Sequence, residues 1–235
     1  MMKQPAMNDF FRFPHTPHLA WLGEGSPRDD KVLSPTEAAE LLQAPVVVEE
    51  KLDGANLGFS VGPDGTVRAQ NRGQYLIEPY GGQFARLASW FQQHEERLFD
   101  GLGQHLIAFG EWCAAKHSLD YDRLPDWWLL FDIYDREQSK FWSVQRRDAW
   151  AQQHGFLCVP RLQTGRTTLA HLQKMVLHEP SSFRSGPLEG LVVRVDEAQW
   201  SLARAKLVRP DFTQAIDMHW RSRSLEWNVV ASNGI

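Results

Sequence analysis

The sequence predicts an α+β fold with a largely antiparallel sheet. Strand-like and helix-like segments mix without the regular strand–helix–strand alternation of a parallel sheet. Two β-prone runs, 57–61 and 66–70, flank the turn Gly62-Pro63-Asp64-Gly65, which is a hairpin signal. No repeat or long linker interrupts the chain, and the segments outside 34–210 are too short for another unit, so we expect one domain over residues 1–235.

The first half of the chain has clear local signals. Residues 34–44 predict a helix in which Ser34 is the N-cap, Pro35 holds the first position and Glu37 completes a capping box. The β-branched run at 46–48 then predicts a buried strand. Apolar residues at helical spacing predict a further helix over 82–99.

In the second half, the pattern of apolar residues predicts four more strands and two more helices. The strands are expected at 105–110, 128–134, 188–195 and 202–208, and the helices near 144–154 and 167–178.

Composition indicates an ordinary globular protein with 43% apolar and 23% charged residues. No run approaches the roughly 20 apolar residues of a membrane helix, and the N-terminus lacks the features of a signal peptide. Cys113 and Cys158 are far apart, which predicts neither a disulfide framework nor a cysteine zinc site. We expect a reduced, cytoplasmic protein without membrane contact.

The net charge of −4 argues against a protein that coats nucleic acid nonspecifically. It is compatible with an enzyme that binds a strand end through a local basic patch. Near the C-terminus, five basic residues provide a patch of this kind: Arg204, Lys206, Arg209, Arg221 and Arg223.

Five short segments carry residues suited to chemistry, and four of them lie in or at the end of a predicted strand. Their polar side chains are therefore expected to converge on one cleft between sheets. In chain order the segments are Glu50-Lys51-Leu52-Asp53-Gly54-Ala55-Asn56, Phe109-Gly110-Glu111-Trp112, Phe131-Asp132-Ile133-Tyr134, Leu188-Glu189-Gly190-Leu191-Val192-Val193-Arg194 and Leu202-Ala203-Arg204-Ala205-Lys206-Leu207-Val208.

Lys51 is a potential nucleophile at the end of the apolar 46–48 strand. A lysine amine attacks phosphorus only when it is neutral, which burial and cationic neighbours favour. Arg204 and Lys206, if they face Lys51, would supply those cations. Taken alone, the Lys-x-Asp-Gly pattern more often indicates a surface lysine at a strand exit.

The other residues each have a functional and a structural interpretation. Glu111 could accept hydrogen bonds from ribose hydroxyls or form a surface ion pair with Lys116 or another cation. Phe131 could stack on a purine or belong to the core. Asp132 could hold a metal-bound water or pair with a lysine.

Glu189 opens an apolar strand, where it could bind hydrated Mg²⁺ or simply face water. Arg204 and Lys206 alternate with apolar residues and so share one face, which is either a phosphate clamp or a solvated surface. Arg72 by default is an exposed turn residue. Asn56 could donate to a phosphate or a ribose, or serve only as a cap.

Together these segments resemble the covalent nucleotidyltransferase superfamily of polynucleotide ligases and messenger-RNA capping enzymes, which share such motifs in this order. Within it, the sequence is most similar to the ATP-dependent RNA ligases of type 2. The segments Phe13–Leu19, Ala115–Leu119 and Leu124-Pro125 also resemble this group, and the resemblance covers about residues 13–220.

The resemblance implies an ATP-grasp-like nucleotidyltransferase domain, with two antiparallel sheets and flanking helices around an ATP cleft. It implies that Lys51 carries a covalent AMP, that Glu189 and Asp53 hold Mg²⁺ or Mn²⁺, and that Arg204 and Lys206 bind the α-phosphate and take part in catalysis. It also implies that Glu50 and Asn56 bind the nucleotide, that Glu111 binds the ribose and that Phe131 stacks on adenine. Arg72 would contact either the nucleotide or the 5′-phosphate end of the substrate. The substrate would be RNA with 5′-phosphate and 3′-hydroxyl ends.

Two departures from the family pattern leave alternatives open. Arg204 stands where type-2 RNA ligases typically have lysine. Only 29 residues follow Lys206, so no appended OB-fold is expected, and a partner protein could help to hold the substrate. The alternatives are an ATP-dependent DNA nick ligase, a GTP-using capping enzyme, or a non-catalytic protein that binds nucleotides or RNA ends.

Overall fold

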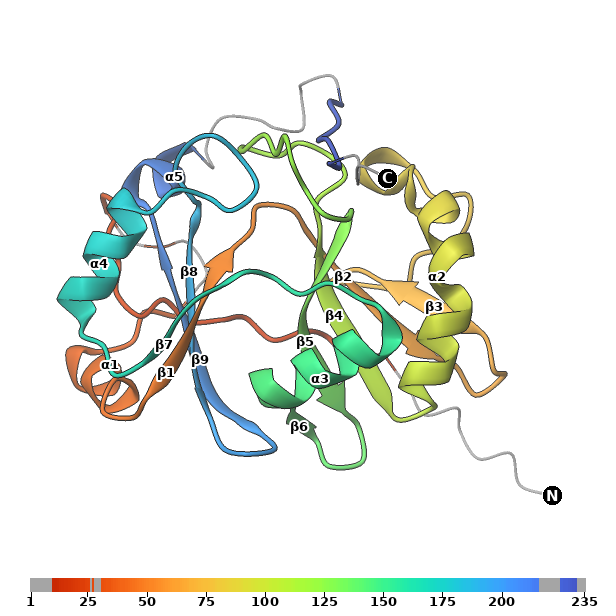
Figure 1. Cartoon of the computed structure of the whole chain (residues 1–235), viewed down its shortest axis with the longest axis horizontal. Coiled ribbons are helices and arrows are strands. Elements are labelled where there is room, and N and C mark those ends of the chain that lie inside the picture. The colour runs from red at the N-terminus through yellow and green to blue at the C-terminus, as the bar shows by residue number, and fades with distance from the viewer. Residues whose placement is uncertain (1–9, 26, 28–30, 216–224, 232–235) are drawn as a thin grey trace.

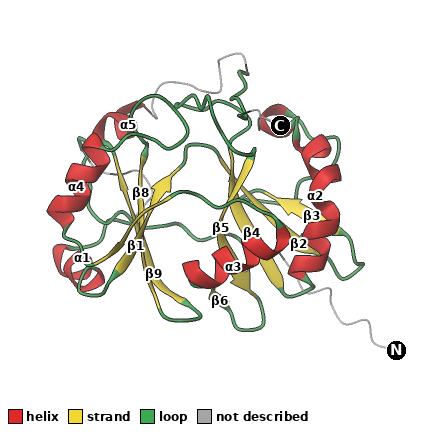
Figure 2. Cartoon of the chain, viewed as in Figure 1, coloured by secondary structure: helices red, strands yellow, loops and turns green. Residues whose placement is uncertain are grey.

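Two antiparallel sheets stand side by side in the computed structural model, which describes residues 10–25, 27, 31–215 and 225–231 (Figures 1 and 2). Sheet A has the order β7 (Arg161–Gly165), β1 (Val46–Lys51), β8 (Gly190–Asp196) and β9 (Ser201–Val208). Sheet B has the order β3 (Val67–Gln70), β2 (Ala55–Val61), β4 (Leu106–Trp112), β5 (Trp128–Asp135) and β6 (Lys140–Phe141). The predicted antiparallel α+β fold is confirmed.

Helices cover the outer faces of the sheets (Figure 1). Three of them lie beside sheet A: α1 (Pro35–Leu41), α4 (Leu169–His178) and α5 (Pro210–Ala215). On the other side, α2 (Leu87–Leu102) packs on sheet B, and α3 (Val144–His154) contacts β5. Each sheet thus has its own apolar core under its helices. None of the helices in the described parts of the chain is long and apolar enough to cross a membrane.

Local signals explain where several elements begin and turn. The capping box at α1 is present, because Ser34 Oγ accepts from Glu37 N and Glu37 Oε2 accepts from Ser34 N. The hairpin between β2 and β3 is also confirmed, with Gly62 N donating to Thr66 O. In α3, Ser143 caps the N-terminus and Gly155 follows the C-terminus in the left-handed conformation.

Some predicted boundaries and elements are wrong. The helix expected over 82–99 is instead a short 3₁₀ helix, Gly82–Phe84, followed by α2, because Gly82 has a φ of +58° that an α-helix does not accommodate. β6, β7 and α5 were not predicted. β6 is two residues long, β7 is a polar edge strand without apolar alternation, and α5 has six residues, so none gives a periodic signal.

The segment 10–19 crosses between the two sheets (Figure 1). Phe11 stacks on Tyr134 of β5 with ring centroids 3.7 Å apart, which fixes it to sheet B. At its other end, Lys206 N donates to Pro17 O and Leu19 N donates to Lys206 O, which pairs it with the edge strand β9 of sheet A. This segment therefore ties the two sheets together beside the cleft.

Candidate active site

A cavity of about 540 Å³ lies between the two sheets, within the size range of small-ligand sites. All five segments singled out in the sequence contribute to its wall, so the predicted convergence is confirmed. The predicted residues that line it are Glu50, Lys51, Asn56, Arg72, Glu111, Phe131, Arg204 and Lys206. Asp53 and Glu189 are not part of this lining. Glu189 contacts the amine of Lys51 directly, and Asp53 follows Lys51 by two residues.

Strand register brings the charged groups together. Lys51 is the last residue of β1 and lies opposite Gly190 of β8, so the neighbouring Glu189 comes within reach of its amine. In sheet B, Asn56 of β2 lies opposite Glu111 of β4. Side chains alternate between the two faces of a strand, which places Glu49 and Lys51 toward the cleft.

The carboxylate of Glu50 has a structural role on the other face of β1. It accepts from Ser181 Oγ at 2.6 Å and from Ser182 N at 2.9 Å. These bonds engage both of its oxygens and fix the side chain against Ser181 and Ser182.

The amine of Lys51 has anionic neighbours rather than the cationic ones expected from the sequence. Its Nζ lies 2.5 Å from Glu189 Oε1, and its side chain is 27% exposed. Burial lowers the pKa of Lys51, but the nearby carboxylates of Glu189, Glu111 and Asp53 outweigh it and raise that pKa above its usual value. The expectation that cations depress this pKa is therefore wrong for the protein without ligand.

Glu189 and Glu111 hold their protons more tightly than ordinary carboxyl groups. Burial raises the pKa of Glu189 to about 8 and that of Glu111 to about 7, and the Asp53 carboxylate adds to both shifts while Lys51 opposes them. Glu189 Oε2 is buried with no hydrogen-bond partner. Shifted carboxyl groups beside a lysine in a cleft are typical of functional sites.

The interpretation of Glu111 as a surface ion-pair partner of Lys116 is wrong. Lys116 Nζ pairs with Glu226 at 2.9 Å. Glu111 Oε1 instead accepts from Gly54 N at 2.9 Å, at the start of β2.

Asp53 and Gly54 shape the turn that follows Lys51. Asp53 Oδ2 accepts from Ser118 N and Leu119 N, both at 2.7 Å. A Cβ on Gly54 would lie 2.5 Å from the carbonyl oxygen of Trp112. Glycine is needed here because the backbone of β4 approaches this position closely.

Phe131 occupies a bulge of β5. Leu130 pairs with Gly110 and Asp132 pairs with Phe109, so Phe131 has no partner in the ladder with β4. A bulge of this kind turns an extra residue out of the regular alternation. Phe131 and Asp132 consequently both line the cavity.

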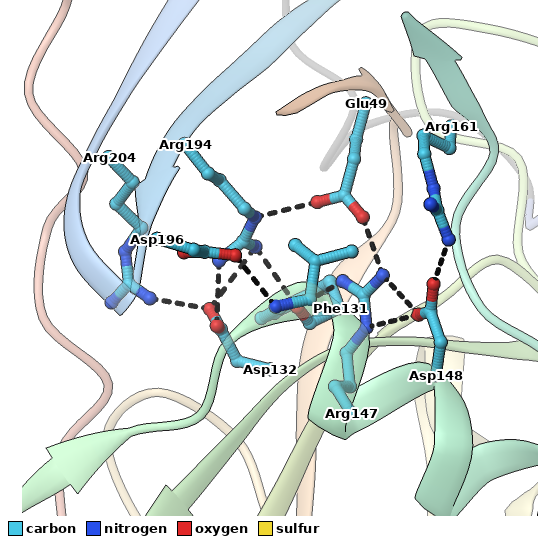
Figure 3. A network of polar contacts seen from close by, with 10 residues as sticks. Glu49, Phe131, Asp132, Arg147, Asp148, Arg161, Arg194, Asp196 and Arg204 are labelled. Carbon is cyan, nitrogen blue, oxygen red and sulfur yellow. Dashed lines mark hydrogen bonds and ion pairs between the residues drawn. The ribbon is translucent and has the colours of Figure 1, made fainter. Parts of the chain in front are cut away.

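A buried network of ion pairs holds this bulge between the sheets (Figure 3). Glu49 accepts from Arg147 Nη2 and from Arg194 Nε, both at 2.6 Å. The same two arginines donate to the carbonyl oxygen of Phe131, at 2.7 and 3.0 Å. Sequence reasoning did not select Glu49, Arg147 or Arg194 individually, although Arg194 ends one of the five segments.

Arg204 belongs to this network as well (Figure 3). Its Nη1 donates to Asp132 Oδ2 at 2.5 Å, and its guanidinium lies over the rings of Phe13 and Phe141 at 4.5 and 4.2 Å from their centroids. Asp132 therefore pairs with arginines, since Arg194 also binds it, and not with the lysine considered from the sequence.

The predicted basic patch is only partly described. Arg209 pairs with Asp211 at 3.0 Å. Arg221 and Arg223 lie outside the described residues.

The residues present fit a divalent metal that is bound mainly by substrate. Within the described ranges, no group of three His, Cys, Asp or Glu side chains is placed to hold a metal ion. Mg²⁺ usually takes one or two carboxylates and completes its shell with water and phosphate oxygens. The unpartnered Oε2 of Glu189 offers one such carboxylate oxygen.

Comparison with known families agrees with this arrangement. The model of the RNA ligase family matches residues 44–208, which is more than half of the chain and includes all five segments. The chain belongs to the RNA ligase family.

Solved RNA ligases share the fold of this family member. A mutant RNA ligase of Naegleria gruberi with ATP and Mn superimposes with a TM-score of 0.60 at 19% identity, over 86% of this chain and 63% of that one. The structure of the same ligase with pyrophosphate gives 0.60 at 18%, over 87% and 63%. An archaeal ATP-dependent RNA ligase gives 0.57 at 20%, over 85% and 48%. This chain thus spans less than two thirds of the ligases it resembles. No protein with a curated description matches the sequence.

Proposed function

We propose that this RNA ligase family member is an ATP-dependent RNA ligase that joins 5′-phosphate and 3′-hydroxyl ends through a lysyl-AMP at Lys51. The observation that carries the proposal is Lys51 in the wall of a nucleotide-sized cavity, with its amine on Glu189. The similar ligase with ATP and Mn, and the archaeal ligase described as ATP-dependent, support ATP as the nucleotide.

In the first step, the neutral amine of Lys51 attacks the α-phosphorus of ATP. A bond forms between Nζ and phosphorus, the bond to the bridging oxygen of the β-phosphate breaks, and pyrophosphate leaves. Glu189 Oε1, at 2.5 Å, is the atom in position to take the proton from Nζ. The Lys51 amine is protonated without ligand, so binding of the nucleotide must precede its activation.

The nucleotide would be oriented by both sheets. Phe131 would stack on adenine, Glu111 would accept from a ribose hydroxyl, and Asn56 would contact ribose or phosphate. Asn56 Oδ1 is buried without a partner, which fits a ligand donor. Lys206, Arg204 and Arg72 line the cavity and would offset charge on the phosphates.

Glu189, through Oε2, together with Asp53 would hold Mg²⁺ or Mn²⁺, which when bound neutralises charge on the phosphate oxygens. Oδ2 of Asp53 already accepts from two backbone amides, so its contribution would come through Oδ1 or the local negative charge.

Two further transfers would complete the reaction. A 5′-phosphate oxygen attacks the phosphorus of lysyl-AMP, which restores the Lys51 amine and leaves an adenylated end. A 3′-hydroxyl then attacks the 5′-phosphorus of that end, and AMP departs as the phosphodiester forms.

Intact mass spectrometry after incubation with ATP and Mg²⁺ tests the first step. Protein treated beforehand with pyrophosphate and Mg²⁺, to remove existing AMP, should gain the mass of one AMP, and Lys51→Ala should gain none. Absence of an adduct would instead favour a non-catalytic binding protein, and an adduct with GTP alone would favour a capping enzyme.

A substrate comparison tests RNA against DNA. Matched nicked duplexes and single strands, with 5′-phosphate and 3′-hydroxyl ends, are offered as RNA or as DNA. We expect sealing of RNA. Preferential sealing of nicked DNA would replace the proposal by a DNA nick ligase, and activity that needs an added protein fraction would indicate a partner protein.

A further inference from the structure

Residues 225–231, called here the C-terminal clamp, pack into the loop between β4 and β5 (Figure 1). Their backbone pairs with both arms of this loop. Asn228 N donates to Ala114 O at 2.9 Å on one arm, and Val229 N donates to Tyr121 O at 2.9 Å on the other. The clamp thereby fixes a loop that has no regular secondary structure of its own.

The side chain of Asn228 joins the two arms directly. Its Nδ2 donates to Cys113 O at 2.8 Å and to Ala115 O at 3.3 Å, and its Oδ1 accepts from Tyr121 N at 2.8 Å. Asn228 is 4% exposed. A buried amide with its donors and its acceptor all engaged specifies one loop conformation, because any other would leave polar groups unpaired.

The opposite side of the same loop holds the residues that follow Lys51. Its backbone donates twice to Asp53 Oδ2, through Ser118 and Leu119. Tyr121, which is buried, accepts from Asp53 N at 2.8 Å through its hydroxyl. The backbone N of Tyr121 donates to the side chain of Asn228, and the Tyr121 hydroxyl accepts from Asp53 N. Tyr121 therefore connects Asn228 with Asp53.

We propose that Asn228 is a positioning residue for Lys51, acting through Tyr121 and Asp53. This inference rests on the proposed adenylation of Lys51. In-line attack requires Nζ in line with the departing pyrophosphate, and a displacement of about 1 Å can cost roughly 100-fold in rate. Asn228 is not among the residues that line the cavity, so it acts on the site through Tyr121 and Asp53 and not by contact with ATP itself.

Single-turnover formation of lysyl-AMP over a range of ATP concentrations tests the proposal. In Asn228→Ala we expect the maximal rate to fall about 10- to 100-fold while the half-saturating ATP concentration changes less than about twofold. Val229→Ala is the matched control, because this neighbouring side chain is 54% exposed, and it should keep the wild-type rate.

Tyr121→Phe removes only the hydroxyl that binds Asp53 N and provides a second variant if Asn228→Ala does not fold. It should also lower the maximal rate, and the double variant should be less impaired than the product of the two single effects, because both act along one line of contacts. All rates are measured well below the Tm of each variant, so that loss of stability alone does not change them.

The outcomes separate the two proposals. Wild-type protein that forms no lysyl-AMP contradicts the proposed function. Wild-type protein that forms it, with folded Asn228→Ala and Tyr121→Phe variants that react at the wild-type maximal rate, overturns the positioning role. A loss expressed only in the half-saturating ATP concentration overturns it as well.

Discussion

The charge of Lys51 depends on which charged side chains lie next to its amine. Glu189, Glu111 and Asp53 surround its amine, whereas Arg204 is bound to Asp132 of β5. A cleft with more carboxylates than cations near the amine attracts positive charge, which suits a metal that arrives with ATP. Before the nucleotide binds, the same carboxylates keep the lysine protonated and unreactive.

Glu111→Gln should change how stability depends on pH. The pKa of Glu111 is about 7 in the folded protein and is near 4.5 when unfolded, so the folded state holds the proton more tightly. The contribution of Glu111 to the free energy of unfolding is present at low pH and is lost as pH rises through about 4.5 to 7. Glutamine does not titrate, so the variant should not lose this stability as pH rises. The difference in the free energy of unfolding is on the order of 2 kcal/mol after allowance for solvent in the cleft.

The Tm of Glu111→Gln relative to wild type should therefore be about 5 °C higher at pH 8 than at pH 4. Differential scanning calorimetry at both pH values measures this difference. Glu96→Gln on the exposed part of α2 is the control. An equal Tm difference at the two pH values would contradict the shifted pKa.

At the scale of elements, β4 and β5 form the site by departing from regular pairing. The bulge at Phe131 frees its carbonyl oxygen for Arg147 and Arg194. Beside the bulge, β5 packs closely on Gly110 of β4. A Cβ on Gly110 would lie 2.4 Å from Trp128 Nε1 and 2.7 Å from Leu129 O. Glycine at 110 thus has a packing role beside the functional Glu111.

Gly110→Ala should destabilise the protein by about 1–3 kcal/mol, because the added methyl group pushes Trp128 and the backbone of β5 away from β4. The Tm should fall by several degrees in a thermal melt. Gly81→Ala is a suitable control, since nothing lies within 4 Å of a Cβ at Gly81. A Gly110→Ala protein as stable as this control would show that β5 adapts without cost.

At the scale of the whole molecule, buried charge joins the two sheets. Glu49 and Arg194 come from sheet A, Asp132 comes from sheet B, and Arg147 comes from α3 (Figure 3). Each charge is compensated by at least two hydrogen bonds, as buried ions require. Because the network also contacts Phe131, the relative position of the sheets and the shape of the cavity are linked.

Removal of one partner should be costly. Arg147→Met leaves the fully buried Glu49 with Arg194 alone and should lower the free energy of unfolding by about 3–5 kcal/mol. Arg161→Met, which removes an exposed partner of Asp148, should cost at most about 1 kcal/mol. Urea denaturation followed by tryptophan fluorescence measures both. Similar losses in the two variants would mean that the buried network does not hold the sheets.

Much of the fold and site was predictable because its signals are local. The cap at Ser34, the 62–65 turn and the apolar periods define most helices and strands within a few residues. Convergence of the segments followed from polar residues at strand ends. β7 and the C-terminal clamp gave no such signal, since each is defined only by the strand or loop it pairs with.

The sequence by itself determined the antiparallel α+β fold, the order of the motifs and the residues that meet at the cleft. Only the tertiary structure decided that Lys51 faces carboxylates, that Arg204 binds Asp132, and that Asn228 reaches Tyr121 from the far end of the chain. The reason is physical. Backbone propensity and apolar periodicity act over a few residues, whereas the charge state and partner of a buried polar group depend on which distant segments pack around it.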